Sequence, residues 1–149
     1  MSHYRSVLRN TDPLNKAIRI ALVVGEFNLE YTGKLEQLNR EFLEAQGFSN
    51  VESYFVPGAF EIPGFAKKLI ETGKYDLIIS IGVVIRGDTP HFDYVCNETA
   101  RGIMKLNTTY DTPIIFGILT CNTEEQVIER MGHGFAVSGL NLLTELKKI

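Results

Sequence analysis

The sequence contains few of the residues that build metal centres and disulfide frameworks. Its 149 residues include two cysteines, three histidines and no tryptophan. Because Cys96 and Cys121 are too few for a disulfide framework or a zinc site, we expect reduced thiols and a cytoplasmic protein. The histidines His3, His91 and His133 lie far apart in the sequence, so we expect no metal ion as a cofactor.

Long apolar runs and a strong net charge are also absent. No apolar run approaches the roughly 18–20 residues that a membrane-spanning helix needs, and we expect no signal peptide because the N-terminus is polar. The formal net charge of −3 gives no electrostatic reason to expect a nucleic acid or a membrane as a partner. With 44% hydrophobic and 22% charged residues, the composition is typical of one soluble globular domain.

Two common nucleotide-binding loops are missing as well. The first predicted strand ends in Gly25-Glu26-Phe27-Asn28, which is not the Gly-x-Gly-x-x-Gly pattern of dinucleotide-binding folds, and no Walker-type Gly-Lys-Ser/Thr loop occurs. The sequence also has no serine in a nucleophile-elbow motif. We therefore expect a protein that uses no organic cofactor.

Strand and helix patterns alternate along most of the chain. Apolar, β-branched runs predict strands at 18–24, 51–56, 75–85 and 113–120. Helical spacing of apolar residues predicts helices at 29–46, 61–72, 91–106, 123–131 and 136–148. Residues 1–16 are polar and irregular, which predicts an N-terminal arm before a single domain at 17–149. This alternation predicts an α/β fold: a three-layer α/β/α sandwich around a four-stranded parallel sheet with right-handed crossovers.

Polar and aromatic residues gather where the predicted strands end. Ligands of open parallel sheets bind outside the carboxyl ends of the strands. The four strand ends carry the segments 25–28, 57–61, 86–91 and 120–123. The third is the densest, because it brings Arg86, Gly87, Asp88, Thr89 and His91 into one turn before a helix. This density of functional groups favours a reaction or binding site over a simple connection.

Each residue at these strand ends also has an ordinary structural interpretation. His91 is a candidate for proton transfer because imidazole titrates near neutral pH, but it is equally a surface residue beside a helix start. The backbone of 87–89 could cradle an anion or be a solvated turn. Phe27 is more often a core residue than a stacking platform, and Glu61 and Arg130 are ordinarily charges that match helix dipoles. Their joint occurrence at strand ends favours the functional interpretation.

Four segments together resemble the 6,7-dimethyl-8-ribityllumazine synthase family, which acts in the penultimate step of riboflavin synthesis. They are Val24–Asn28, Val56–Pro63, Gly82–Gly102 and Phe116–Arg130. The most specific motifs are Pro-Gly-Ala-Phe-Glu-Ile-Pro, from residue 57, and Ile-Arg-Gly-x-Thr-x-His-Phe-Asp-Tyr-Val, from residue 85. The resemblance covers about residues 17–148 and implies a flavodoxin-like fold.

The resemblance implies a reaction and an assembly. The reaction condenses two small molecules, 5-amino-6-(D-ribitylamino)uracil and 3,4-dihydroxy-2-butanone 4-phosphate, into the lumazine, and it releases phosphate and water without a cofactor or a metal. The assembly is a homo-oligomer, either a pentamer or an icosahedral 60-mer built from pentamers, with active sites between neighbouring subunits. In such an assembly the Tyr4–Leu8 segment of the arm would add a strand to the sheet of a neighbouring subunit.

The resemblance also assigns roles to single residues. His91 matches the proton-transfer residue. The matching substrate-binding residues are Phe27, Ala59, Phe60, Glu61, Val83, Val84, Ile85, Asp88, Thr89, Phe116 and Arg130. Phe27 would stack on the pyrimidine, 59–61 would hold the ribityl chain, and the backbone of 83–85 would meet the uracil edge. Asp88, Thr89 and Arg130 would bind the phosphate, and Phe116 would reach the site of the adjacent subunit.

The sequence departs from the usual family pattern at three places. Glu26 stands where an arginine is usual, and Asp88 replaces a small neutral residue in the phosphate turn. The loop after Arg130 is short by about half a dozen residues, and no lysine occurs between Arg130 and Lys147. The short loop favours an isolated pentamer over the 60-mer, with His133 as a partial substitute for the missing cation.

These departures support a second hypothesis, a non-catalytic member of the family that binds lumazine or flavin. A third hypothesis, a flavodoxin-like signalling domain, would need an acidic cluster at the end of the first strand. Glu26 alone does not supply such a cluster.

Overall fold

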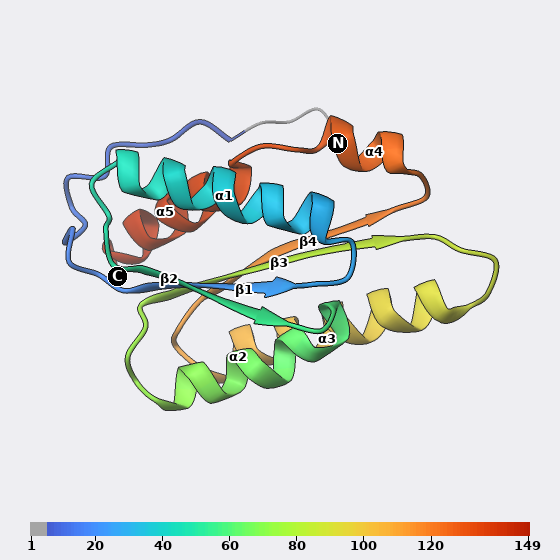
Figure 1. Cartoon of the computed structure of the whole chain (residues 1–149). Helices are drawn as coiled ribbons and strands as arrows, with labels where there is room; N and C mark the ends of the chain where they lie inside the picture. Colours follow the sequence, from blue (N-terminus) through green and yellow to red (C-terminus); the bar gives the residue numbers. More distant parts are fainter. Residues whose placement is uncertain (1–5) are drawn as a thin grey trace.

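A computed structural model of the chain describes residues 6–149, which form one parallel sheet between two layers of helices (Figure 1). The strands are β1 (Ile20–Gly25), β2 (Val51–Val56), β3 (Leu77–Ile85) and β4 (Ile114–Cys121). The helices are α1 (Leu29–Ala45), α2 (Ile62–Glu71), α3 (His91–Thr109), α4 (Glu124–Glu129) and α5 (Gly134–Leu146), and a single 3₁₀ turn, η1 (Ala59–Glu61), precedes α2.

Both faces of the sheet are covered with apolar side chains. Helices α1 and α5 lie on one face, and α2 and α3 lie on the other (Figure 1). Successive strand residues alternate between the two cores: Leu22 and Ile79 pack in the cluster beneath α1 and α5, whereas Val23 and Ile78 pack beneath α2 and α3. Complete burial of each such side chain contributes roughly 1.5–3 kcal/mol. The predicted three-layer sandwich is confirmed.

The strand order β2-β1-β3-β4 sets where a ligand can bind. After β1 the chain enters α1 on one face, and after β3 it enters α3 on the opposite face (Figure 1). The two connections therefore diverge at the carboxyl ends of β1 and β3, which are adjacent and parallel in the sheet. In doubly wound sheets this point of divergence opens a crevice, and ligands bind there.

Every strand and helix that the sequence predicts is present, and the differences lie at their ends. Helix α3 continues to Thr109, three residues beyond the predicted end at 106. The amide of Asn107 explains this extension: it donates to the carbonyls of Ile103 and Ile114 and accepts the N–H of Ile114. The last turn of α3 is thereby tied to the first residue of β4.

The described part of the N-terminal arm contacts its own chain. The N–H of Arg9 donates to Asn141 Oδ1 at 2.9 Å, Asn141 Nδ2 donates to the carbonyl of Val7 at 3.0 Å, and Arg9 forms an ion pair with Glu145. All these contacts are with α5, and Leu14 is buried in the core beneath α1 and α5. Residues 4 and 5 of the segment predicted to pair with a neighbouring subunit lie outside the described residues.

Candidate active site

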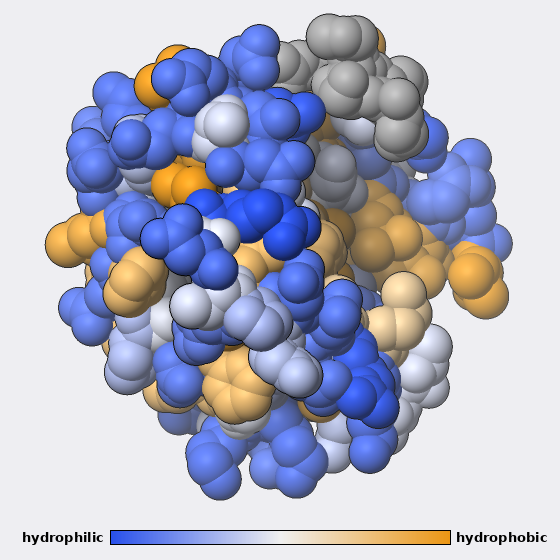
Figure 2. All heavy atoms as spheres, turned by 90° about the vertical axis from the view of Figure 1, so that its right-hand side faces the viewer, coloured by the Kyte–Doolittle hydropathy of each residue, from blue (hydrophilic) through white to orange (hydrophobic). Residues whose placement is uncertain are grey.

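A cavity of about 670 Å³ lies at the carboxyl ends of β1, β2 and β3. Figure 2 views the molecule from this end, where apolar atoms are visible among hydrophilic side chains. Nine of the predicted site residues line the cavity, namely Phe27, Ala59, Phe60, Glu61, Val83, Val84, Ile85, Thr89 and His91. The fold therefore brings together residues that are separated by more than sixty positions in the sequence.

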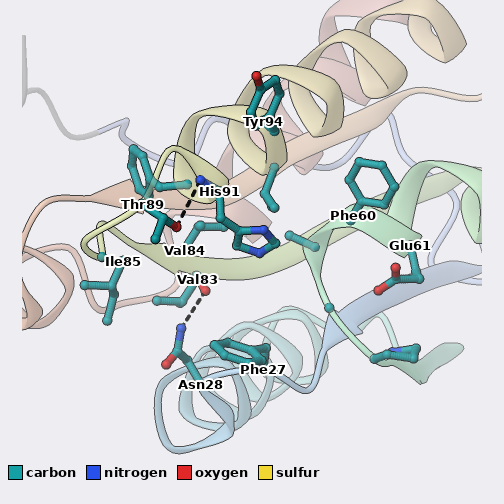
Figure 3. A pocket seen from close by; sticks show the side chains of 16 residues that line it. Phe27, Asn28, Phe60, Glu61, Val83, Val84, Ile85, Thr89, His91 and Tyr94 are labelled. Atoms are coloured by element: carbon teal, nitrogen blue, oxygen red, sulfur yellow. Dashed lines mark hydrogen bonds between the residues drawn. The ribbon is translucent and has the colours of Figure 1, made fainter.

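The turn after β1 forms one wall of the cavity. The N–H groups of Glu26 and Phe27 donate to the carbonyls of Val56 and Pro57, which holds this turn against the end of β2. Phe27 is 74% exposed, so its ring is available at the mouth of the cavity (Figure 3). An exposed aromatic ring beside a cavity provides a flat apolar surface for a planar ligand.

Asn28 connects this turn to β3. Its backbone is in the left-handed region, with φ 64°, which asparagine tolerates better than most residues. Its Nδ2 donates a hydrogen bond of 2.8 Å to the carbonyl oxygen of Val83 (Figure 3). Asn28 also lines the cavity, and the sequence-based list of site residues omits it. One feature of the sequence could have identified it: an asparagine follows the buried first strand and Phe27, and it stands directly before a helix.

The η1 turn forms the adjoining wall. Two glycines let it approach the sheet closely: a Cβ on Gly25 would lie 3.0 Å from the carbonyl carbon of Gly58, and one on Gly82 would lie 3.2 Å from Ala59 Cβ. Ala59 is buried, whereas Phe60 and Glu61 are exposed at the rim. Figure 3 shows the Glu61 carboxylate on this wall, where it can accept hydrogen bonds from ligand hydroxyl groups.

The last residues of β3 form the floor. Strand β1 pairs with β3 only as far as Ile81, whereas β4 pairs with it as far as Ile85. The β1-side backbone edge of residues 83–85 is therefore left without a strand partner. The carbonyl of Val83 lies on this edge, because it accepts the Asn28 amide. Backbone groups at such an edge can recognise the polar edge of a ligand.

His91 is the first residue of α3, and its ring points into the cavity between the floor and the η1 wall (Figure 3). Thr89 Oγ1 accepts the N–H of His91 at a long 3.4 Å. Within residues 6–149 the imidazole itself has no hydrogen-bond partner, so both ring nitrogens are available to a ligand. The side chain of Tyr94, one turn further on, points away from the ring (Figure 3).

Three predicted site residues do not line this cavity. Asp88 is exposed in the turn between Gly87 and Thr89, which do line it. Phe116 lies on the edge strand β4 and is 44% exposed. Arg130 follows α4, donates from Nη1 to the carbonyl of Gln126 at 2.9 Å, and has Glu129 Oε1 at 3.7 Å. Both β4 and α4 lie on the far side of β3 from the crevice, which accounts for the separation of Phe116 and Arg130 from it.

The sequence-based list also omits several neutral lining residues. These are Pro57, Gly58, Gly87, Phe92, Tyr94 and Val95. Phe92 and Val95 lie on the inner side of α3, and helical periodicity marks them as core residues. They also line the cavity, but the periodicity of the helix does not show where the crevice opens.

The described residues give no sign of a metal centre. In residues 6–149, no group of three or more His, Cys, Asp or Glu side chains is arranged to hold a metal ion. In the same part of the chain, every helix is too short or too polar to cross a membrane.

The fold and the cavity together define a flavodoxin-like α/β protein with a candidate ligand site at the β1/β3 crevice, where a histidine begins a helix. The model of the 6,7-dimethyl-8-ribityllumazine synthase family matches residues 17–143. Since this match spans most of the chain, the protein belongs to that family. The family consists of transferases of riboflavin biosynthesis that act on small-molecule substrates and form oligomers.

Proposed function

We propose that this enzyme condenses 5-amino-6-(D-ribitylamino)uracil with 3,4-dihydroxy-2-butanone 4-phosphate to form 6,7-dimethyl-8-ribityllumazine. The observation that carries the proposal is the position of His91. In a chain of this family, the imidazole points into a cavity whose floor is a backbone edge without a strand partner. A titratable group facing a polar recognition edge is what an amine–ketone condensation requires.

The pyrimidine substrate fits the walls formed by β1, β3 and η1. Phe27 would stack on the planar ring, and the backbone of 83–85 would pair with its carbonyl and N–H groups. The ribityl chain would extend along η1, where the Glu61 carboxylate accepts hydroxyl hydrogen bonds. The exposure of Phe27 and of the Glu61 side chain supports this orientation.

The phosphate substrate fits the turn before α3. Gly87 has open space at its Cβ position, so an anion can approach its backbone N–H, and the N-terminus of α3 adds a partial positive charge. Arg130 would supply the cation, since its guanidinium has five donors and can bind phosphate in a bidentate manner. Asp88 opposes this binding electrostatically because it is a carboxylate in the same turn.

The proposed reaction has several successive steps in this cavity. The 5-amino group of the pyrimidine substrate attacks the ketone carbon, and water leaves as the imine forms. Elimination then releases inorganic phosphate, and after tautomerisation a second carbon–nitrogen bond closes the new ring with loss of water. His91 accepts and returns protons during these steps. Holding both substrates in one cavity supplies a further large part of the acceleration.

A pentamer is the assembly we propose, with Phe116 of each subunit reaching the cavity of its neighbour. Two observations support it. The edge strands β2 and β4 expose Phe55 and Phe116, and exposed aromatic residues are enriched at protein interfaces. The connection between α4 and α5 comprises only residues 130–133, which favours the pentamer over the 60-mer. The cytoplasmic location stays a prediction.

The test is lumazine formation, followed by fluorescence with both substrates and compared with the enzyme-free reaction. A rate clearly above the enzyme-free reaction supports the synthase. No acceleration, combined with measurable lumazine or flavin binding, would assign the protein to the non-catalytic alternative. The observation that favours this alternative is the exposed Asp88 carboxylate beside the proposed phosphate position.

A further inference from the structure

The side chain of Arg86 contacts the start of α3, which lines the cavity, and the β4–α4 turn, although Arg86 itself is not among the lining residues. Its Nε donates to Asn122 Oδ1 at 2.9 Å, in the turn between β4 and α4. Its Nη2 lies 3.5 Å from Asp93 Oδ1, and its guanidinium carbon lies 4.4 Å from the centroid of the Phe92 ring, both in the first turn of α3. One planar group thus joins α3 to the β4–α4 turn across the end of β3.

On the α3 side, the contacts of Arg86 fall directly after His91. Phe92 and Asp93 are the next two residues, so a side chain that fixes them also fixes the start of the helix that carries the imidazole. Few other contacts hold the preceding turn. In the described structure Gly87 has open space around its Cβ position, and the hydrogen bond from His91 N to Thr89 is long at 3.4 Å.

On the α4 side, a chain of hydrogen bonds leads from Arg86 to Arg130. Asn122 accepts Arg86 Nε, and the N–H of Asn122 donates to Gln126 Oε1 at 2.6 Å. The carbonyl of Gln126 in turn accepts Arg130 Nη1 at 2.9 Å. Figure 1 shows α3 and α4 on opposite faces of the sheet, both beginning at the end where β3 and β4 terminate. Arg86 therefore occupies the point between them.

We propose that Arg86 is a positioning residue that holds in place both the start of α3, which carries His91, and the β4–α4 turn, which leads to Arg130. This inference rests on the function proposed above, in which His91 transfers protons and Arg130 binds the phosphate. The Asp93 contact fixes the position of the His91 imidazole, and the Asn122 contact fixes the position of Arg130, the cation proposed to bind the phosphate. A guanidinium suits this role because its donors are rigid and point in several directions at once, which a lysine ammonium cannot reproduce on both sides.

An ordinary surface ion pair is the competing explanation. Arg86 and Asp93 are about half exposed, with side-chain exposures of 47% and 53%, and such pairs contribute little stability. The two explanations differ in what a mutation changes. A surface pair affects folding slightly and the kinetic constants not at all, whereas a positioning residue affects the kinetic constants with little change in Tm.

The experiment measures kcat, both KM values and Tm for Arg86→Lys, Asn122→Ala and Asp93→Asn beside the unmutated protein. Arg101→Lys is the matched control, because Arg101 also pairs with an acidic residue of α3 but is highly exposed and does not line the cavity. We expect Asn122→Ala to raise the KM of the phosphate substrate about threefold or more, with the pyrimidine KM unchanged. Asp93→Asn should lower kcat about threefold or more, and Arg86→Lys should do both.

Three outcomes overturn the inference. Kinetic constants of Arg86→Lys that equal those of the unmutated protein would show that the contacts position nothing. If the variants lose activity only in proportion to a fall in the folded fraction, Arg86 is a stabilising residue and not a positioning residue. An unmutated protein that does not accelerate lumazine formation would refute the proposed function and this inference with it, whereas an active protein with unaffected variants would refute this inference alone.

Discussion

The side-chain amide of Asn28 donates a hydrogen bond of 2.8 Å to the carbonyl oxygen of Val83. This bond joins the turn after β1 to the last residues of β3, the two strands whose connections diverge to form the crevice. It also holds in place the turn that carries Phe27. The site is therefore stabilised by a contact between its wall and its floor.

Replacing Asn28 separates its two contributions. Asn28→Gly keeps access to the left-handed backbone but removes the amide, so we expect a pyrimidine KM several-fold higher with a loss of about 1 kcal/mol in the free energy of unfolding. Asn28→Ala also strains the backbone and should lose about 1–2 kcal/mol more. Urea unfolding and steady-state kinetics measure both effects. Equal stabilities of the two variants would contradict the role given to the positive φ.

Gly25 sets the distance between the β1 end and the η1 turn. In Gly25→Ala the new Cβ would lie 3.0 Å from the carbonyl carbon of Gly58 and 3.1 Å from the N atom of Ala59. Both are backbone atoms, so η1 must shift. We expect about 1–3 kcal/mol of destabilisation and weaker binding of the pyrimidine substrate.

The matched control for this variant is Gly64→Ala, within α2. A Cβ at Gly64 would have open space, and alanine favours a helix more than glycine does, so we expect this variant to be neutral or more stable. Denaturant unfolding compares the two. Equal effects at both positions would refute the close-approach argument.

Much of the fold could be predicted from local sequence. β1 is buried at every residue and β3 at its first seven residues, and their apolar, β-branched runs are the strongest patterns in the chain. The edge strand β2 was also found, although it exposes Glu52 and Phe55. Spacing does not encode which strands are neighbours in the sheet. The contact of Arg86 with Asn122 therefore could not be foreseen, since it depends on the pairing of β3 with β4.

The candidate site could be predicted only in part, because the sequence does not show which strands are neighbours. The rule that ligands bind at the carboxyl ends of strands makes Phe27, Glu61 and His91 candidates, and the cavity is lined by all three. Asn28 was missed because both of its contributions, the left-handed backbone and the hydrogen bond to Val83, depend on how β1 and β3 lie together in the fold. Arg130 and Phe116 were placed in the site by resemblance alone, and in the single chain they lie beyond the far side of β3.

Charged side chains at the proposed phosphate position should change the KM of the phosphate substrate and leave the KM of the pyrimidine substrate unchanged. We expect Arg130→Ala to raise the KM of the phosphate substrate about tenfold, because a charged hydrogen-bond donor is lost. Asp88→Asn should lower the same KM about threefold, because a like charge is removed. Steady-state kinetics at fixed ionic strength measures both. An effect of either variant that is confined to the pyrimidine substrate would place the phosphate elsewhere.

Tyr31 should titrate later than an ordinary tyrosine. Its hydroxyl donates to Glu124 Oε1 at 2.6 Å, and this hydrogen bond, with the negative charge of nearby glutamates, raises the pKa of Tyr31 to about 12. Because the pKa is higher in the folded state than in the unfolded state, the associated stability is present below pH ~10 and is lost as the pH rises towards 12.

The ultraviolet absorbance of tyrosinate measures this titration. The difference between the unmutated protein and Tyr31→Phe gives the Tyr31 curve alone. We expect Glu124→Gln to move that curve to lower pH, because the hydrogen bond to a charged acceptor is removed. A midpoint near the ordinary value of about 10 in the unmutated protein would show that α1 and α4 are not joined by this bond in solution.

The most direct test of the central claim compares lumazine formation by the unmutated protein, by His91→Asn and without enzyme, at the same substrate concentrations. We predict that the unmutated protein exceeds the enzyme-free rate, and that His91→Asn lowers kcat by at least about tenfold. Both proteins should bind the lumazine product with similar affinity and have similar Tm values. A kcat of His91→Asn equal to that of the unmutated protein, or an unmutated protein no faster than the enzyme-free reaction, would contradict the account.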